Sequence, residues 1–380
     1  MAAVALSAAA TVWQTRAEAA ELSVGTFWST VANQPCQVYN RRTGGRFEPY
    51  TWSGACVDGK VSGRGQLTFG DGRHVFVGAM KAGKQHGYGT LIWANGNRYE
   101  GEWRNGRPHG HGVSAAAGGD RYEGDFRNGK QHGHGILARA DGSRYEGEWR
   151  EGRQHGHGTS TAANGDRHEG GYRNGWAHGH GTFTWPNGDR YEGDWRKGRR
   201  HGQGIATFAN GDRYEGEWRE GKQQGHGIDT ASNGERYEGE YRNGKRHGQG
   251  TLVLADGGRY EGDWRNGQRH GHGALVLDSG GRYEGEWREG RQHGHGAVTL
   301  ASGSRYVGQY RDGKPNGHGA LTFADGSRYE GEYRDGRPHG FGIYSDADGN
   351  AVQGQWREGC FKQDGRWLAL NTTGKACGFK

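Results

Sequence analysis

Histidine pairs of the form His-Gly-His recur along the chain, as at His109 and His111. Imidazoles are good ligands for zinc, copper and nickel, and alternate residues of a strand share one face, so each pair could offer an ion two ligands. The pattern returns at His132 and His134, His155 and His157, and His293 and His295. Equivalent histidines in neighbouring copies would lie about 10 Å apart, too far to share one ion. We expect no dedicated metal site and no cofactor, and leave weak metal adsorption open.

Two other motifs resemble ligand loops. Gly-x-x-x-x-Gly-Lys, as in a phosphate-binding loop, occurs at residues 124–130, 216–222 and 239–245. No Ser or Thr follows the lysine, and each segment runs through a hairpin turn instead of into a helix. Residues 346–350 begin like a calcium loop, but Ala351 occupies the position of the required glycine. Both motifs are predicted to be ordinary strand and turn segments.

Paired carboxylates such as Glu100 and Glu102 could serve general acid–base catalysis. A catalytic site, however, needs one asymmetric set of groups in a pocket, whereas these glutamates recur identically along the chain. With Arg98 and Arg104 beside them, they are predicted to form cross-strand charge ladders on a solvated face. We therefore predict that the protein is not an enzyme.

The four cysteines form two sequence-local pairs, Cys36 with Cys56 and Cys360 with Cys377. Disulfides in loops of this size would stabilise each end by roughly 3 kcal/mol and indicate an oxidising compartment. A zinc site is the alternative, but no Cys-x-x-Cys spacing occurs. The pairs predict disulfides near the two ends of a repeat array.

The N-terminal residues resemble a targeting segment. Ala2 to Trp13 is a short apolar stretch, and Ala17-Glu18-Ala19 fits a small-x-small cleavage site. Residues 1–19 are predicted to be a signal peptide, which makes the protein periplasmic or secreted. No Lys or Arg precedes the apolar stretch. A start codon placed too late would explain this lack of a basic start, and a structureless Ala-rich tail is the alternative.

Composition limits the kind of fold. The 380 residues include 78 glycines and only 31% hydrophobic residues, which argues against compact hydrophobic cores. Disorder is also a poor fit, because 14 Trp, 18 Tyr and 11 Phe need burial. The 50 basic and 43 acidic residues nearly balance, which argues against a nucleic-acid partner.

A 23-residue repeat resolves this conflict. The tyrosine at Tyr99 recurs at every twenty-third residue, with Phe76 and Val352 as the outermost members of thirteen copies. The intervening members are Tyr122, Tyr145, His168, Tyr191, Tyr214, Tyr237, Tyr260, Tyr283, Tyr306 and Tyr329.

Each copy is predicted to be a β-hairpin. Tyr99, Gly101 and Trp103 alternate with Glu100 and Glu102, which gives an aromatic face and a charged face. Residues 105–106 supply a turn, and residues 118–120 supply a second turn before the next copy. Rings are expected to lie over glycines such as those at 101, 110 and 112, so that no second layer is needed. Consecutive hairpins should pair edge to edge.

The aromatic face is also the predicted binding surface. Its rings could stack on a ligand, as aromatic side chains commonly do. The residues assigned to it are Tyr99, Trp103, Tyr122, Phe126, Tyr145, Trp149, Tyr191, Trp195, Tyr214, Trp218, Tyr260, Trp264, Tyr283 and Trp287.

The pattern Tyr-Glu-Gly-Glu-Trp-x-x-Gly, then His-Gly-x-Gly, then Asp-Gly or Asn-Gly, resembles the MORN-repeat family over residues 57–359. The resemblance implies an elongated antiparallel sheet and roles in protein assembly, dimerisation and contact with acidic phospholipids. The segment Trp52-Ser53-Gly54-Ala55-Cys56 is similar to flanks of exported bacterial MORN proteins. Five departures, His168, Gly171, Trp176, Val307 and Gln309, are expected to mark irregularities or a contact surface.

The predicted fold class is therefore all-β: an elongated single antiparallel sheet, or β solenoid, of tandem hairpins at residues 57–359. Disulfide-stapled caps at residues 20–56 and 360–380 would protect its edges. The predicted function is a non-catalytic scaffold for an unidentified protein partner or a second copy of the chain. Stacking on envelope glycans and association with acidic phospholipids are the alternatives, and sequence alone does not choose between them.

Overall fold

The computed structural model of the chain describes residues 27–40, 50–70, 72–363, 366–372 and 377. The chain divides into two compact units, residues 1–199 and 200–380, and each is described by itself. The described residues form strands and turns, with no α-helix among them. The predicted signal peptide at residues 1–19 lies outside the described residues.

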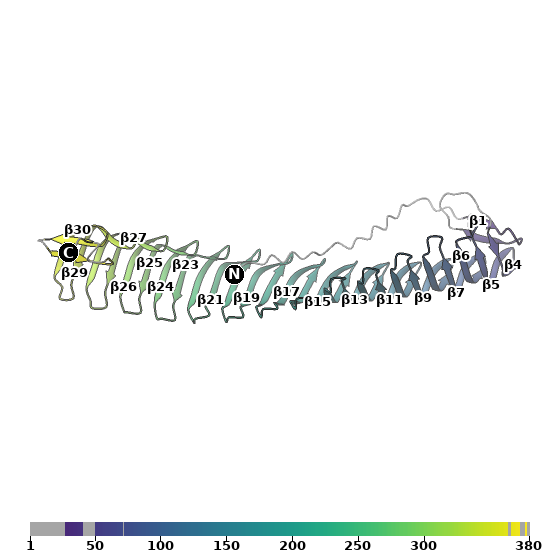
Figure 1. Cartoon of the computed structure of the whole chain (residues 1–380), viewed down its shortest axis with the longest axis horizontal. Helices are drawn as coiled ribbons and strands as arrows, with labels where there is room; N and C mark the ends of the chain where they lie inside the picture. Colours follow the sequence, from purple (N-terminus) through teal and green to yellow (C-terminus); the bar gives the residue numbers. More distant parts are fainter. Residues whose placement is uncertain (1–26, 41–49, 71, 364–365, 373–376, 378–380) are drawn as a thin grey trace. The chain divides into compact units, whose positions relative to one another are not determined.

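The described residues of the first unit form sixteen strands, which follow one another in chain order through most of the unit (Figure 1). They are β1 (Phe27–Thr30), β2 (Gln37–Asn40), β3 (Thr51–Trp52), β4 (Ala55–Val57), β5 (Lys60–Thr68), β6 (Val75–Lys81), β7 (Lys84–Ile92), β8 (Arg98–Arg104), β9 (Arg107–Ala115), β10 (Arg121–Arg127), β11 (Lys130–Ala138), β12 (Arg144–Arg150), β13 (Arg153–Thr161), β14 (Arg167–Arg173), β15 (Trp176–Thr184) and β16 (Arg190–Arg196).

The second unit continues the pattern from β17, whose first residue is the last residue of the first unit. Its strands are β17 (Arg199–Thr207), β18 (Arg213–Arg219), β19 (Lys222–Thr230), β20 (Arg236–Arg242), β21 (Lys245–Val253), β22 (Arg259–Arg265), β23 (Gln268–Val276), β24 (Arg282–Arg288), β25 (Arg291–Thr299), β26 (Arg305–Arg311), β27 (Lys314–Thr322), β28 (Arg328–Arg334), β29 (Arg337–Ser345), β30 (Ala351–Trp356), β31 (Cys360–Gln363) and β32 (Arg366–Ala369).

Neighbouring strands pair antiparallel from β5 to β16 in the first unit and from β17 to β30 in the second. The prediction of an all-β fold of tandem hairpins is confirmed. The strands of each unit form an open meander, so the described residues do not make the closed coil that the term β solenoid implies.

The turn inside each hairpin explains its tight closure. Asn105 and Gly106 both have positive φ, 53° and 78°. Two consecutive residues with positive φ characterise the type I′ turn, whose twist matches that of paired strands. The Gly106 amide also donates to the Gln85 carbonyl of the preceding copy, at 2.9 Å. The turn therefore closes its own hairpin and ties it to the neighbouring one.

The turn between hairpins is built from a different set of hydrogen bonds. The Trp93 amide donates to the Asn97 carbonyl and the Gly96 amide donates to the Trp93 carbonyl, each at 2.9 Å. The Asn97 side chain accepts a hydrogen bond from the Ala117 amide, one copy further on, at 2.9 Å. An Asp or Asn at this position thus links one copy to the next.

A β-bulge interrupts the pairing inside each hairpin. Gly101 lies opposite Gly112 and Trp103 lies opposite Pro108, so one residue on β8 faces three on β9. Gly110, among those three, has a φ of 63°, a conformation that glycine adopts readily. The bulge lets the strands bend where the aromatic ring crosses the backbone.

The core is a layer of rings on glycine backbone, as predicted. Tyr99 is 1% exposed, and a Cβ added at Gly112 would lie 2.4 Å from its hydroxyl oxygen. That hydroxyl donates to the Glu102 carbonyl at 2.9 Å, while the Trp103 indole N–H donates to the Gly89 carbonyl at 3.0 Å. The polar atoms of these two rings therefore both have a backbone partner.

The rings also pack edge to face along the chain. The Tyr99 ring lies 5.0 Å from that of Trp103 in its own copy and 5.0 Å from that of Phe126 in the next, at 89° and 84°. Such pairs contribute about 0.5–1.5 kcal/mol each beyond burial. The aromatic layer thus couples neighbouring hairpins.

Tyr310 occupies the repeat position that Trp103 has in its own copy, and its hydroxyl lacks a hydrogen-bond partner in the described part of the chain. The hydroxyl of Tyr310 is buried and has no hydrogen-bond partner among the described residues. We expect Tyr310→Phe to stabilise this hairpin by about 1 kcal/mol, since it removes an unsatisfied hydroxyl. Tyr306→Phe is the matched control, because it removes a hydroxyl that donates to the Gln309 carbonyl at 3.0 Å and should destabilise by about 1 kcal/mol. Hydrogen exchange of β26 and β27 measures both, and equal signs would contradict the assignment.

The N-terminal end departs from the repeat. Strand β1 pairs with β2, and β5 receives β3 and β4 antiparallel and a single parallel bridge from β2. The predicted Cys36–Cys56 disulfide is present, and Trp52 and Val61 are buried beside it in the same core cluster. This irregular end covers the first repeat strands.

The C-terminal end changes the thirteenth predicted copy. Strand β30 pairs with β29 as a repeat strand, but β31 pairs with β32 and makes no long ladder with β30. Phe361 stacks on Trp356 at 5.0 Å, and a Cβ at Gly354 would meet its ring at 2.9 Å. The predicted Cys360–Cys377 disulfide is present. The last copy therefore supplies one repeat strand and then becomes part of the end structure.

Candidate functional site

The face of each hairpin opposite the aromatic layer is the candidate functional surface. On the hairpin of β8 and β9 it carries Arg98, Glu100, Glu102, His111 and Val113, and we call these residues and their equivalents the polar face. Alternation along the strands places them together, because the intervening residues point into the aromatic layer.

Arginine and glutamate pair along the strand on this face. Arg121 contacts Glu123 at 2.6 Å, and both side chains are about half exposed. Cross-strand ladders were predicted, and that detail is wrong, because the residues opposite Glu100 are Thr90 and Val113. Equivalent in-strand pairs begin at Arg98, Arg144, Arg167, Arg190, Arg213, Arg236, Arg259, Arg282 and Arg328. Exposed pairs contribute little stability, so their main effect is on surface charge.

The side chain two residues after the paired glutamate accepts a hydrogen bond from a backbone amide at the bulge. The Glu102 carboxylate accepts a hydrogen bond from the His111 amide at 3.2 Å, and Glu148 accepts one from the His157 amide at 2.8 Å. Gln309 does the same for His318 at 2.9 Å. The two glutamates of the Glu-x-Glu motif thus have different partners.

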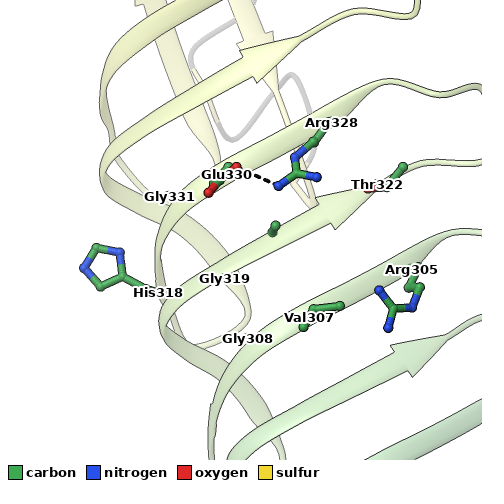
Figure 2. A pocket seen from close by; sticks show the side chains of 10 residues that line it. Arg305, Val307, Gly308, His318, Gly319, Thr322, Arg328, Glu330 and Gly331 are labelled. Carbon is green, nitrogen blue, oxygen red and sulfur yellow. Dashed lines mark hydrogen bonds and ion pairs between the residues drawn. The ribbon is translucent and has the colours of Figure 1, made fainter.

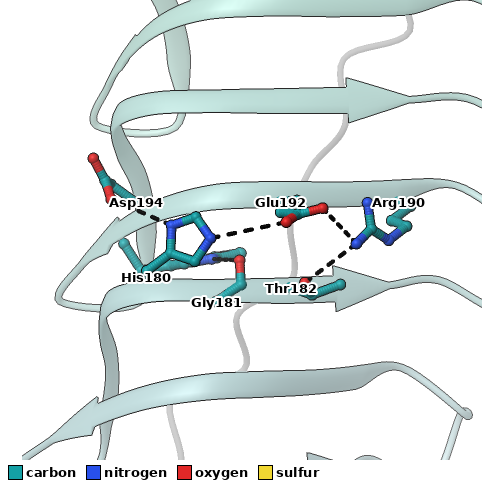
Figure 3. Close-up of polar contacts among 7 residues, drawn as sticks. His180, Gly181, Thr182, Arg190, Glu192 and Asp194 are labelled. Carbon is teal, nitrogen blue, oxygen red and sulfur yellow. Dashed lines mark hydrogen bonds and ion pairs between the residues drawn. The ribbon is translucent and has the colours of Figure 1, made fainter.

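The second histidine of each His-Gly-His pair is exposed, and the imidazoles of His111, His180 and His295 lie within 4.0 Å of a carboxylate. His180 is 67% exposed, with Nδ1 3.7 Å from Asp194 and Nε2 4.0 Å from Glu192 (Figure 3). Glu192 also pairs with Arg190, whose guanidinium donates to Thr182 at 3.5 Å. Protonation of the imidazole would therefore neutralise part of a local negative charge.

The first histidine has different surroundings. Nδ1 of His109 is buried without a hydrogen-bond partner among the described residues, and a glycine with positive φ separates it from His111. The equivalent atoms of His132, His155, His201, His293 and His339 are in the same situation. In the described part of the chain, no three His, Cys, Asp or Glu side chains gather as metal ligands.

The fourteen aromatic residues assigned to a binding surface are placed in the core. Tyr191 and Tyr214 have no exposed surface, and Trp195, the most open of the fourteen, is 9% exposed. Burial also raises the pKa of the core tyrosines, to about 12 at Tyr172, so their hydroxyls remain protonated. A ligand ring cannot stack on these side chains in this conformation.

The motifs that resemble ligand loops are strand and turn segments. Residues 124–130 run from β10 through the turn at Asn128 and Gly129 into β11. The Asp346 carboxylate accepts hydrogen bonds from the Asn350 amide and side chain, at 2.8 and 2.9 Å, and so closes its own turn. Among the residues that the structure describes, no helix has the length and apolarity that crossing a membrane requires.

The departures from the repeat have separate structural roles. His168 is buried beside Tyr172, and a Cβ at Gly171 would lie 2.1 Å from the His178 carbonyl oxygen. The Trp176 ring packs close to Gly198, where an added Cβ would lie 3.1 Å from it. Val307 is 41% exposed on the polar face.

Two shallow hollows lie on the polar face, one in each unit. The first has a volume of about 400 Å³ and is lined by Arg305, Val307, His318, Thr322 and Arg328, among others (Figure 2). The second has a volume of about 490 Å³, and its lining includes Arg64, Val77 and Tyr88. Each hollow contains a valine where other copies have the glutamate of the Arg–Glu pair. Sequence reasoning noted Val307 but did not predict that it opens a hollow.

A sequence model of the MORN repeat matches twelve consecutive segments. They are residues 76–98, 99–121, 122–144, 145–167, 168–190, 191–213, 214–236, 237–259, 260–282, 283–305, 306–328 and 329–351. The match ends before the altered last copy. A search of curated proteins finds no match.

Similar solved structures include the SAS-4 TCP domain of Drosophila melanogaster, bound to a proline-rich motif of Ana2. It is 12% identical, with a TM-score of 0.27, over 47% of this chain and 90% of that one. The CPAP G-box domain is 11% identical, with a TM-score of 0.25, over 59% and 100%. Virginiamycin B lyase of Staphylococcus aureus is 11% identical, with a TM-score of 0.13, over 85% and 96%.

Proposed function

Because the chain belongs to the MORN-repeat family, we propose that it is a non-catalytic scaffold that binds a protein partner through the polar face of its repeats. MORN repeats are in general interaction repeats. A repeated surface offers a partner many equivalent contacts, so moderate contacts can add up to useful affinity.

The observation that carries the proposal is the regular polar face. Guanidinium, carboxylate and imidazole groups recur with the 23-residue period and remain about half exposed. The fourteen aromatic side chains assigned to a binding surface, by contrast, are buried in the core. Association through this face should therefore be polar and sensitive to salt.

The two disulfides support an oxidising compartment. The proposal places the protein in the periplasm or outside the cell. Its partner would then be an envelope or secreted protein, or a second copy of the chain. Envelope glycans and acidic phospholipids stay as alternative ligands, and burial of the aromatic rings gives glycan stacking less support.

Crosslinking tests the proposal. The tagged full chain is crosslinked in its own cell envelope, and captured proteins are identified by mass spectrometry. The control variant lacks residues 214–282, which are three whole copies. One protein recovered with the full chain and reduced at least tenfold with the variant would support a scaffold. Recovery of no specific protein would overturn the proposal and favour a glycan or lipid ligand.

A further inference from the structure

One arginine of the polar face lacks the carboxylate that its equivalents have. Ten arginines at this position pair with the glutamate two residues on, as Arg282 does with Glu284 at 2.6 Å. Val307 stands at the glutamate position of Arg305, and Arg305 has no ion pair among the described residues. The same strand carries a second uncharged residue, because Gln309 replaces the second glutamate.

The missing side chain leaves usable space. Around Arg305 the hollow holds a second guanidinium, Arg328, already paired with Glu330 at 2.6 Å (Figure 2). Two guanidiniums therefore face one carboxylate, which leaves one positive charge uncompensated. The floor includes Val307 and Ala320, which lie opposite each other on β26 and β27. The hollow thus combines an unpaired cation with an apolar floor.

The second hollow indicates that the two hollows form for the same reason. There too a valine, Val77, occupies the glutamate position, and Arg64 lies in the lining. The two hollows lie in different units and share this substitution. We infer that the glutamate side chain fills this part of the polar face in other copies, and that its replacement by valine opens it.

We propose that the hollow at Arg305 and Val307 binds an acidic side chain from an extended segment of the protein partner, in place of the missing glutamate. The ligand carboxylate pairs with the Arg305 guanidinium, and its methylene groups lie on Val307 and Ala320. Planar guanidinium suits a carboxylate because it can donate two parallel hydrogen bonds. This inference rests on the proposed scaffold function and names where on the polar face the partner binds.

A segment fits this site better than a free carboxylate. One exposed ion pair changes an equilibrium by no more than about fivefold, so useful affinity needs further contacts. Ile343 supplies one, since it is 42% exposed and lies opposite Glu330, in the row that contains Val307 and Ala320. That row crosses three strand spacings, about 14 Å, or about four residues of extended chain. The ligand should carry an apolar side chain about four residues from its acidic one.

The probe is a displayed library of random ten-residue peptides selected on the full chain. We expect enrichment of an acidic residue with an apolar residue about four positions away. The Kd of a selected peptide should rise at least tenfold in Val307→Glu, which restores the in-strand pair, repels the ligand carboxylate and removes the apolar contact. It should rise about threefold to fivefold in Arg305→Ala, which removes one exposed ion pair. Arg311→Ala, an exposed arginine at the far end of the same strand, should change the Kd less than twofold. Glu284→Val should add a second site by freeing Arg282.

The outcomes separate this inference from the scaffold proposal. Selected peptides that bind wild type and Val307→Glu equally would overturn the site. Displacement of the peptide by acetate, but not by chloride at equal ionic strength, would show that a free carboxylate is the ligand and overturn the segment. If a crosslinked partner binds wild type and Val307→Glu equally, the scaffold function is supported and the proposed binding site is wrong. If no partner is captured but Val307→Glu weakens peptide binding tenfold, the site stands without the scaffold.

Discussion

Gly250→Ala is expected to destabilise the hairpin β20–β21 by about 2–4 kcal/mol. The new methyl group would lie 2.3 Å from the Tyr237 hydroxyl oxygen and 2.6 Å from two ring carbons. The ring has little room to move, because Tyr241 and Trp264 pack against it at 5.3 and 5.2 Å. Overpacking of this kind costs about 1–3 kcal/mol, and loss of the hydroxyl's hydrogen bond to the Glu240 carbonyl adds about 1 kcal/mol.

Gly281→Ala is the matched control for this substitution. A Cβ there would have Leu277 at 3.6 Å as its nearest neighbour, an ordinary contact, and Gly281 does not have positive φ. This change should be neutral or stabilise by about 0.5 kcal/mol through the unfolded chain. Native-state hydrogen exchange measures the local opening free energy of both variants. Similar opening free energies in the two variants would show that packing of the Tyr237 ring does not require glycine at position 250. Adding Tyr237→Leu to Gly250→Ala should recover part of the loss.

His168→Tyr is expected to remove a loss of stability at acid pH. His168 is 4% exposed, and burial lowers its pKa to about 4. Its Nδ1 lies 2.9 Å from the Tyr172 hydroxyl, which donates to Ser160 at 2.7 Å, so the network assigns the proton of the neutral ring to Nδ1. Nε2 is buried without a partner among the described residues, and protonation there would place a charge in the core.

The sign follows from the two pKa values. In the unfolded chain the imidazole has a pKa near 6.5, whereas in the folded protein its pKa is about 4. Between these pH values the unfolded chain therefore binds a proton that the folded protein does not. The contribution of His168 is therefore full above about pH 6.5 and falls as the pH decreases toward 4. Between pH 7 and pH 5 the loss is about 2 kcal/mol. After burial, the electrostatic effect of His157 also lowers the pKa of His168, and the charge of Glu169 raises it.

Hydrogen exchange of β14 and β15 at pH 7 and pH 5 tests this expectation. Wild type should lose about 2 kcal/mol of opening free energy that the His168→Tyr variant keeps. Strands β18 and β19, whose copy has Tyr214 at the equivalent position, serve as the internal reference and should not differ between the two proteins. An equal pH response of β14–β15 in both would mean that the buried imidazole does not control it.

Much of the fold could be predicted because the same strand and turn pattern recurs in nearly every copy of the repeat. The alternation of Tyr99, Gly101 and Trp103 predicts the strand, and the Asn105-Gly106 pair predicts the turn that closes the hairpin. Glycine opposite a ring predicts the packing, because any side chain there would collide with the ring. Sequence separation alone paired the cysteines correctly.

Other features depend on the bulge and on the strand register, which the alternation of residues along a strand does not predict. The bulge after Gly101 turns Glu102 toward an amide, so identical glutamates acquire different partners. The in-strand pairing of Arg98 with Glu100 follows from which neutral residues lie across the sheet, and that requires the register. The aromatic surface was interpreted as open to ligands, whereas the rings cover one another edge to face.

The shared register of neighbouring hairpins sets a rule for changes in chain length. Gly248 faces Trp264 between β21 and β22, and Gly271 faces Trp287 between β23 and β24, one period later. Loss of residues 260–282 would bring Gly248 opposite Trp287 and recreate the same junction. Loss of one residue fewer would turn every following side chain to the wrong face. Whole copies can therefore be gained or lost by gene recombination without any compensating substitution.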